Sequence, residues 1–281
     1  MKIGIIGLGL MGGSFGRTLV KKGYTVYGYD VSQDVMLKAE LMKAFTEPLT
    51  EKTAKKVDLI IAAVNPSAFR RAIEPFLPHL KSGAVVSDFC GVKRVIVSKM
   101  QEYSKAYPAL FFIGTHPMAG REFSGIEHSS ITLFEKASMI LVPIKADIFT
   151  LDKIKEFYLS VGFSRVVITD AEHHDSVIAY TSELCHIVSN AFILSAQADN
   201  RLGYSAGSFR DLTRVARLSP EMWTEIIAAN RDMALSELDE FIGNLNKYRA
   251  AIAEKDDEKL KSLFSAGNER KIKIESENKN A

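Results

Sequence analysis

His116 is the residue of this sequence best suited to handle a proton. It lies in the segment Gly114–Gly120 (GTHPMAG), directly after the apolar run Leu110–Ile113. The run is short and rich in aromatic and β-branched residues, so it predicts a buried strand, and Gly and Pro predict an exposed loop at its end. Such loops carry the chemistry of many α/β enzymes. His116 is therefore a candidate general base, although a surface or hydrogen-bonded structural histidine gives the same pattern.

A glycine-rich motif follows the first apolar segment of the chain. Residues 2–6 predict a buried strand, and residues 7–12 (GLGLMG) have the spacing G-x-G-x-x-G and open a helix that ends near Lys22. Glycines at these positions permit a tight turn and let backbone N–H groups approach a pyrophosphate at the helix N-terminus. The predicted cofactor contacts in this loop are Gly7, Leu8, Gly9, Leu10, Met11 and Gly12.

An acidic residue at the end of the second predicted strand indicates which dinucleotide binds. Residues 25–29 predict this strand, and Asp30 follows it near the ~20-residue offset at which a carboxylate can bond both ribose hydroxyls. Its charge opposes a ribose 2′-phosphate, and residues 31–33 offer no arginine to hold one, which predicts NAD rather than NADP. A helix N-cap or turn role would also explain Asp30. The loop after a later strand is predicted to line the same cleft, through Val64, Asn65 and Pro66.

Polar residues of the second half are candidates for substrate binding. Segments 173–175 and 182–186 fall on one predicted helix, and segment 209–214 lies near the start of another. His186 follows Ser182 by one turn, and Arg214 follows Arg210 by one turn, so each pair shares a helix face. An arginine facing a cleft suits a carboxylate substrate. An ion-pair cluster of these arginines with Asp211 at a domain interface is the alternative.

Strand-like and helical segments alternate over the first 170 residues. Further strands are predicted at 57–64, 84–88, 110–114, 138–142 and 165–169. This alternation predicts an α/β fold, a Rossmann-type doubly wound and mostly parallel sheet. From residue 171 the pattern becomes helical, so we expect domains at 1–170 and 171–281, the second all-helical. Helices predicted at 226–253 and 256–264 could pack on a partner subunit or within their own domain.

Composition excludes several classes of protein. The chain has 281 residues, 47% hydrophobic content and a formal net charge of +2, which indicates a globular protein without a nucleic-acid partner. Cys90 and Cys185 lie far apart without metal-ligand or redox spacing, which predicts reduced thiols, a cytoplasmic location and no metal. No apolar segment reaches the ~20 residues that span a bilayer, so no membrane partner is expected.

Several blocks resemble the prephenate/arogenate dehydrogenase family, in order along nearly the whole chain. They are residues 88–93 (DFCGVK), 114–120 (GTHPMAG), 174–175 (HD), 182–186 (SELCH), 209–214 (FRDLTR) and 220–223 (PEMW). The resemblance implies an NAD-dependent enzyme of tyrosine biosynthesis that oxidatively decarboxylates prephenate to 4-hydroxyphenylpyruvate, usually as a homodimer built through its helical domains. It also implies that His116 accepts the proton of the ring hydroxyl, that Arg214 holds a substrate carboxylate and that His186 contacts the substrate side chain.

Four further residues are substrate-site candidates through these blocks, and two of them depart from the family pattern. Gly91 stands where the family often has serine, so a hydroxyl that assists the catalytic histidine must come from elsewhere or from water. Glu183 stands where histidine is frequent. A carboxylate there could pair with an amino group, which keeps arogenate open as substrate, but we favour Glu183 facing solvent or Arg210. Lys93 either touches the substrate or caps a helix, and Asp211 is the fourth candidate.

Two other functions fit part of the pattern. β-Hydroxyacid dehydrogenases resemble the chain in the Gly-Leu-Gly-x-Met-Gly opening and a helical second domain. They use a catalytic lysine in a helix, however, and residues 171–209 contain no matching lysine motif. A nucleotide-binding regulator that senses NAD or tyrosine would bind without turnover.

Overall fold

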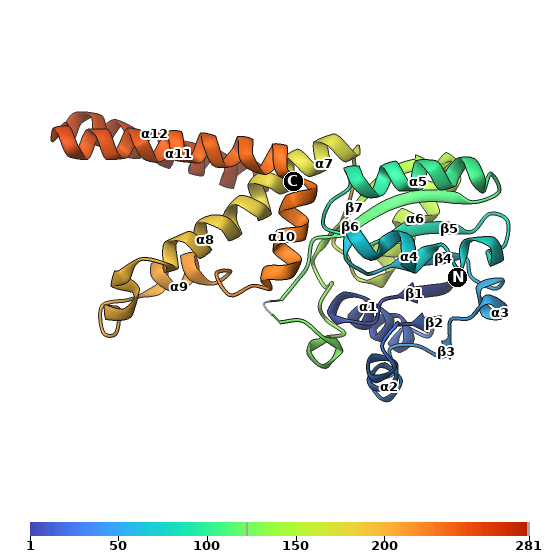
Figure 1. Cartoon of the computed structure of the whole chain (residues 1–281). Coiled ribbons are helices and arrows are strands. Elements are labelled where there is room, and N and C mark those ends of the chain that lie inside the picture. Colours follow the sequence, from blue (N-terminus) through green and yellow to red (C-terminus); the bar gives the residue numbers. More distant parts are fainter. Residues whose placement is uncertain (122, 280–281) are drawn as a thin grey trace. The chain divides into compact units, whose positions relative to one another are not determined.

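Eight strands form one sheet in the order β3-β2-β1-β4-β5-β6-β7-β8 (Figure 1). The computed structural model describes residues 1–121 and 123–279. All neighbouring strands pair in parallel except β6 and β7. The predicted doubly wound, mostly parallel sheet is confirmed, and β3 is a short strand that the sequence did not predict. The strands are β1 (Lys2–Ile6), β2 (Thr25–Tyr29), β3 (Glu47–Pro48), β4 (Leu59–Ala62), β5 (Val85–Asp88), β6 (Phe111–Pro117), β7 (Ser138–Lys145) and β8 (Arg165–Ile168).

Strand β6 is longer than its apolar run predicts. It continues through Pro117 because β7 pairs with it in the antiparallel direction, which places His116 opposite Ile140. The prediction that His116 lies in an exposed loop is therefore wrong. The histidine is a half-buried strand residue with its backbone held by the sheet.

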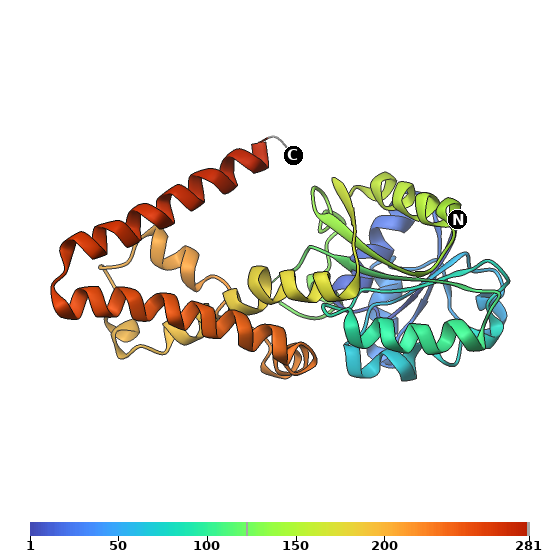
Figure 2. The same cartoon turned by 90° about the horizontal axis from the view of Figure 1, so that it is seen from above.

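Helices cover both faces of the sheet, and Figure 2 shows α5 (green) and α6 (yellow-green) on opposite sides. Neighbouring residues of one strand face different cores, as with Ile5 and Ile6 of β1. Since both faces are buried, the carboxyl ends of the parallel strands are the place for a ligand site. The helices of this region are α1 (Leu10–Lys21), α2 (Gln33–Leu41), α3 (Glu51–Ala54), η1 (Pro66–Ala68), α4 (Phe69–Ile73), η2 (Leu77–His79), α5 (Arg94–Ala106), η3 (Ile126–His128) and α6 (Ile148–Val161).

A continuous helical run follows the last strand. It consists of α7 (Ala171–Ile178), a π-helical turn η4 (Ala179–Leu184) and α8 (Cys185–Ile193), so segments 173–175 and 182–186 share one rod as predicted. Then come η5 (Ala196–Asn200), α9 (Gly207–Thr213) and α10 (Pro220–Ala229). The Ser189 hydroxyl donates to the Leu212 carbonyl at 2.7 Å, and the Asn190 amide donates to the Ala216 carbonyl at 3.1 Å. These two bonds fix the segment that carries Arg214.

The last two helices differ from the sequence prediction, the first in where it begins and the second in where it ends. Contacts within the chain define two compact units, 1–231 and 232–281. The predicted helix 226–253 is interrupted at Asn230, after which α11 (Arg231–Glu254) begins, and α12 (Asp257–Lys279) runs well beyond the predicted 256–264. Tyr248 joins α11 to α12, because its hydroxyl donates to the Leu263 carbonyl at 3.2 Å. No helix of the described residues combines the length and apolar character needed to cross a membrane.

Candidate functional site

The loop between β1 and α1 is shaped by its glycines. Gly7 has a φ of +86°, and a Cβ there would lie 2.4 Å from the Ala63 carbonyl oxygen. A Cβ on Gly12 would lie 1.9 Å from the Gly7 oxygen, whereas a Cβ on Gly9 would meet nothing within 4 Å. Gly9 is also the N-cap of α1 and offers no side-chain acceptor to the first-turn N–H groups. The loop is therefore closely packed at Gly7 and Gly12 and open at Gly9. It leaves the N-terminus of α1, the positive end of the helix dipole, accessible to a pyrophosphate.

Asp30 lies beside this glycine loop. One carboxylate oxygen accepts a hydrogen bond from the Leu8 amide at 2.8 Å, and the other accepts from the Ser32 amide at 2.9 Å. Ser32, and not Asp30, is the N-cap of α2, so the helix-cap alternative for Asp30 is wrong, although the turn contact exists. This is the position from which a carboxylate can reach the ribose hydroxyls of a dinucleotide.

The loop after β4 is tied to two neighbouring segments. The Val64 carbonyl accepts from the Cys90 thiol at 3.2 Å, and the Ser67 amide donates to a carboxylate oxygen of Glu225 on α10 at 2.6 Å. Asn65 is the N-cap of η1, and Pro66 is its first residue. The loop lies at the carboxyl end of β4, next to β1, where the strand order reverses and α/β sheets bind ligands.

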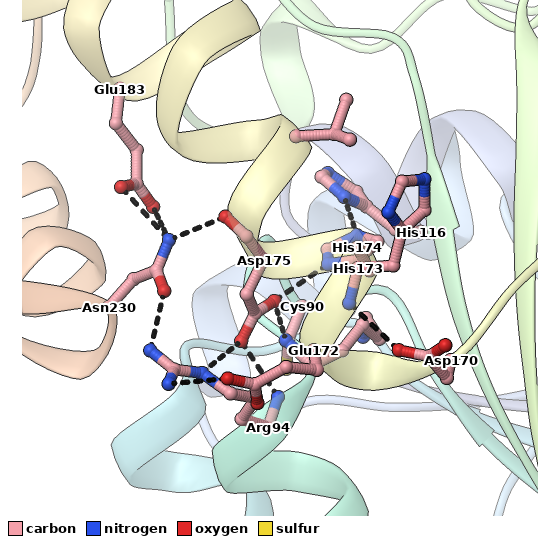
Figure 3. A network of polar contacts seen from close by, with 12 residues as sticks. Cys90, Arg94, His116, Asp170, Glu172, His173, His174, Asp175, Glu183 and Asn230 are labelled. Carbon is pink, nitrogen blue, oxygen red and sulfur yellow. Dashed lines mark hydrogen bonds and ion pairs between the residues drawn. The ribbon is translucent and has the colours of Figure 1, made fainter. Parts of the chain in front are cut away.

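His116 forms a short chain of contacts with two residues of α7 (Figure 3). Its Nδ1 lies 2.9 Å from Nε2 of His174, and Nδ1 of His174 lies 2.6 Å from a carboxylate oxygen of Asp175. Both α7 side chains are buried. The sequence placed His174 and Asp175 in a family block but did not identify them as partners of His116.

The N-terminus of α5 holds the Asp175 carboxylate. The Lys93 amide donates to one oxygen at 2.7 Å and the Arg94 amide to the other at 2.9 Å. Burial raises the pKa of Asp175, but the hydrogen bonds from His174 and from these amides outweigh it and lower the pKa below its usual value. Asp175 is therefore an ionised acceptor.

Both histidines of this chain of contacts favour the neutral form. Burial, the neighbouring His174 and the positive charge of Lys93 hold the pKa of His116 well below its usual value. Burial also lowers the pKa of His174, with Lys93 acting in the same direction and Asp175 opposing it. A neutral imidazole at near-neutral pH can accept a proton.

Lys93 is buried at the start of α5, beside Asp88. Its ammonium group forms a hydrogen-bonded ion pair with Asp88, and neither side chain has exposed surface. Lys93 is the N-cap residue of α5, but its side chain makes no cap hydrogen bond. Asp88 also accepts from the Thr115 amide at 3.1 Å, so the pair braces β6 next to His116. Lys93 therefore occupies the N-cap position of α5, while its completely buried side chain pairs with Asp88.

The expectation that Glu183 faces solvent or Arg210 is wrong. Glu183 is completely buried, and both its carboxylate oxygens lie 3.1 Å from the side-chain amide nitrogen of Asn230. Asn230 also donates to the Asp175 carbonyl at 2.9 Å and accepts from the Arg94 guanidinium at 2.9 Å (Figure 3). The break between α10 and α11 brings Asn230 into this network, which local sequence patterns do not reveal.

His186 belongs to a second polar cluster. Its ring stacks on Trp223 of α10 with centroids 3.8 Å apart, and its Nδ1 lies 2.8 Å from the Ser182 carbonyl, to which it can donate. Burial and the charge of nearby Arg214 lower the pKa of His186, while the carbonyl opposes them. Trp223 was not among the predicted site residues, although the block 220–223 contains it.

The remaining candidates differ in their surroundings. Arg210 and Asp211 are exposed on α9. A Cβ on Gly91 would lie 3.7 Å from the Ile226 side chain, which is an ordinary contact, so sterics do not require glycine there. Among the described residues, no group of three or more His, Cys, Asp or Glu side chains is arranged to hold a metal ion.

Comparison with known proteins identifies the family. Residues 15–168 match the family described as prephenate dehydrogenase, nucleotide-binding domain, and residues 170–266 match prephenate dehydrogenase, dimerization domain. Cyclohexadienyl dehydrogenase of Zymomonas mobilis is 30% identical over 98% of this chain and 96% of its own length. Prephenate dehydrogenase of Bacillus subtilis is 28% identical over 92% of this chain and 72% of its own.

A solved structure agrees with these sequence relatives. Prephenate dehydrogenase from A. aeolicus, in complex with hydroxyphenyl propionate and NAD⁺, superposes with a TM-score of 0.84 and 28% identity, covering 98% of both chains. Matches to the two domains together span most of the sequence, and the fold agrees over nearly its whole length. The chain therefore belongs to the prephenate dehydrogenase family.

Proposed function

We propose that this chain is an NAD-dependent dehydrogenase that oxidatively decarboxylates prephenate to 4-hydroxyphenylpyruvate. The observation that carries the proposal is the position of His116. It lies near the carboxyl end of β6, at the edge of the sheet that also carries the glycine loop and Asp30. Its Nδ1 contacts His174, which leaves Nε2 to meet a substrate.

The reaction requires few protein groups. Prephenate carries a hydroxyl and a carboxylate on opposite carbons of a cyclohexadiene ring. The glycine loop and Asp30 would hold NAD⁺, which would supply the acceptor for the hydride of the carbinol carbon. Nε2 of His116 accepts the hydroxyl proton, and the bond to the ring carboxylate then breaks, so that carbon dioxide leaves and its bonding electron pair makes the ring aromatic. The resulting phenolate oxygen takes the proton back from His116, which gives 4-hydroxyphenylpyruvate and a neutral histidine. A positioned general base typically contributes ~10²–10⁴ in rate, and orientation by the site supplies more.

Substrate binding is assigned to the cluster around His186. Arg214 carries a planar guanidinium that can bind a carboxylate through two parallel hydrogen bonds, and it lies close enough to His186 to lower its pKa. Trp223 supports His186 by stacking. Gly91, beside Ile226 of α10, and Asp211, on α9, remain candidates for contacts at the rim.

Cofactor binding is assigned to the carboxyl ends of β1, β2 and β4. The α1 N-terminus takes the pyrophosphate, Asp30 takes the ribose hydroxyls, and the loop Val64–Pro66 lines the cleft. The glycine-loop contacts remain Gly7, Leu8, Gly9, Leu10, Met11 and Gly12.

We propose prephenate rather than arogenate as the substrate, because the position of Glu183 weakens the argument for arogenate. The sequence-based argument for arogenate requires this carboxylate beside the substrate amino group. Glu183 is instead completely buried and bonded to Asn230. Its carboxyl group therefore has a hydrogen-bond partner inside the protein, and the argument loses its support.

Domain division, assembly and location complete the proposal. The boundary is placed between 170 and 171, since β8 ends at Ile168 and α7 begins at Ala171. Backbone amides of the sheet region donate hydrogen bonds to Asp175 of α7 and Glu225 of α10, which explains why residues up to 231 group with the sheet. A homodimer is supported by the matched dimerization domain and by apolar side chains exposed on α11 and α12, such as Ile252 and Phe264. Two free cysteines support a cytoplasmic location.

NADH formation tests the proposal directly. Purified protein is assayed with NAD⁺ or NADP⁺ against prephenate and arogenate in parallel, and we expect turnover with NAD⁺ and prephenate. His116→Asn should lose at least about 100-fold in kcat while NAD⁺ binding survives. Equal loss of turnover and binding would make His116 a structural residue. NAD⁺ binding without turnover of either substrate would overturn the dehydrogenase assignment and favour a regulator.

A further inference from the structure

We infer that His174, held by Asp175, is a positioning residue that fixes the tautomer of His116 and keeps the lone pair of its Nε2 available to the substrate hydroxyl. The inference deepens the proposed function and rests on it for the identity of the substrate.

Hydrogen-bonding rules determine the direction of each bond. An ionised carboxylate can only accept, so Nδ1 of His174 donates to Asp175 across 2.6 Å. A neutral imidazole with a proton on Nδ1 has an acceptor at Nε2. Nδ1 of His116, 2.9 Å away, must therefore be the donor. A neutral His116 that donates from Nδ1 has its lone pair on Nε2.

The surrounding contacts prevent His174 from turning away. Asp175 receives the Lys93 and Arg94 amides on its two carboxylate oxygens, so the acceptor of His174 is fixed to the start of α5. The carbonyl of Asp175 accepts from Asn230, which also binds Glu183. His174 itself is 2% exposed. The His174 ring is therefore held in one orientation, and its hydrogen bond with Nδ1 of His116 orients the His116 ring.

The charges facing the two rings match this role. Asp175 stands one ring away from His116 and stabilises the positive charge that His116 acquires with the proton. The positive charge of Lys93, which would oppose protonation of His116, is paired with Asp88 inside the protein. Arg94 lies against Asp175, with Nε 3.4 Å from its carboxylate, and also approaches Glu172 at 3.5 Å.

The glycine at position 91 has no side chain that could orient His116. It provides no hydroxyl with which to orient the catalytic histidine, and a Cβ there would have only an ordinary contact with Ile226. His174 contacts His116 from the opposite element, α7, and supplies the orienting hydrogen bond.

Two substitutions of His174 separate tautomer control from packing. His174→Phe removes both ring nitrogens, whereas the side-chain carbonyl oxygen in His174→Gln can accept a hydrogen bond from Nδ1–H of His116 but cannot be protonated as an imidazole can. His173→Gln is the matched control, because His173 is the exposed neighbour on the same helix. The readouts are ¹⁵N NMR of the His116 ring, assigned by comparison with His116→Asn, and kcat and NAD⁺ affinity.

We expect wild-type His116 to carry its proton on Nδ1 and His174→Phe to lose this preference. In His174→Phe, kcat should fall by about 10-fold to 100-fold with unchanged NAD⁺ affinity, as for other groups that orient a catalytic ligand. His174→Gln should restore the tautomer and part of kcat, and His173→Gln should behave as wild type.

Three results would overturn the inference. They are a proton on Nε2 of His116 in the wild-type protein, an unchanged tautomer in His174→Phe, or unchanged kcat in that variant. The NMR signal does not require turnover, so it remains informative if no substrate is converted. In that case a His174-dependent tautomer supports the inference while the proposed function fails.

Discussion

Lys93 and Asp88 form an ion pair in which both side chains are completely buried and shielded from water. Asp88 also accepts a hydrogen bond from the Thr115 amide, so the pair links the end of β5, the start of α5 and the strand that carries His116. A buried pair of this kind adds little net stability by itself, but loss of one partner leaves an uncompensated buried charge.

Removal of Lys93 alone should destabilise the protein strongly. We expect Lys93→Met to lower the free energy of unfolding by about 3–5 kcal/mol, measured by urea denaturation. The double variant Lys93→Met/Asp88→Asn should recover part of this loss, because no charge is then left unpaired. Lys105→Met, at an exposed position of the same helix, is the control and should change stability by less than about 0.5 kcal/mol. Equal effects at the two positions would contradict the burial argument.

Asp30 should control cofactor affinity without affecting the chemical step. We expect Asp30→Asn to weaken NAD⁺ binding about 10-fold to 100-fold, the equivalent of losing one charge-assisted hydrogen bond, while kcat at saturating NAD⁺ is kept. Asparagine retains an acceptor for the Leu8 amide. The ratio of NAD⁺ to NADP⁺ affinity, measured by titration, should fall. Asp34→Asn removes a nearby exposed carboxylate that pairs with Lys38, and it should leave both affinities unchanged.

Activity should persist into mildly acidic solution. His116 must be neutral to accept a proton, and burial lowers its pKa well below its usual value. The acid limb of kcat/KM should therefore lie below about pH 6.5, the ordinary histidine pKa. The pH profile is measured with prephenate and NAD⁺ at low substrate concentration. An acid limb above pH 6.5 would show that another group limits the reaction or that His116 is not the base.

Folding stability should decrease as the pH falls through the histidine range. The pKa values of His116, His174 and His186 are all lowered in the folded protein, so the unfolded chain binds more protons as the pH drops through about 6.5. The contribution of these three histidines to the free energy of unfolding is fully present above about pH 6.5 and is lost as the pH falls below it. Asp175 acts in the same direction, but only below its ordinary pKa near 4. Urea midpoints between about pH 7.5 and 5.5 test this, and His116→Asn should flatten the slope.

Trp223 should influence substrate affinity through His186. The stacked pair is worth roughly 0.5–1.5 kcal/mol, so Trp223→Leu should raise KM for prephenate by about 2-fold to 10-fold with a smaller change in kcat. Steady-state kinetics at saturating NAD⁺ measure both. Met222→Leu, the neighbouring substitution on α10, serves as the control. If kcat falls instead while KM is constant, Trp223 acts on the chemical step.

Local patterns were sufficient to predict the fold around the glycine loop and Asp30. The glycine loop, the second strand and Asp30 are close in sequence, and their geometry follows from backbone sterics and the βαβ connection. The parallel strands were also predictable, because burial on both faces requires apolar runs.

The proton-handling side could not be predicted in the same way, since it depends on contacts between distant segments. His116 belongs to a strand only because β7 pairs with it, and its partner His174 comes 58 residues later. Glu183 is buried because Asn230, 47 residues further on, satisfies its carboxylate. These pairings depend on how α7 and α10 pack, which no local pattern encodes.

The π-helical turn η4 gives the length of the segment between two motifs a specific meaning. A π-helical turn holds one residue more than an α-helical turn. The side chains of α8 are therefore rotated around the helix axis by about 100° from the positions that an uninterrupted α-helix would give them. Deleting one of the residues Ala179–Thr181 would keep every side chain of both polar clusters and still direct His186 away from Trp223. A sequence relative with one residue fewer between these motifs would therefore share their composition but not their geometry.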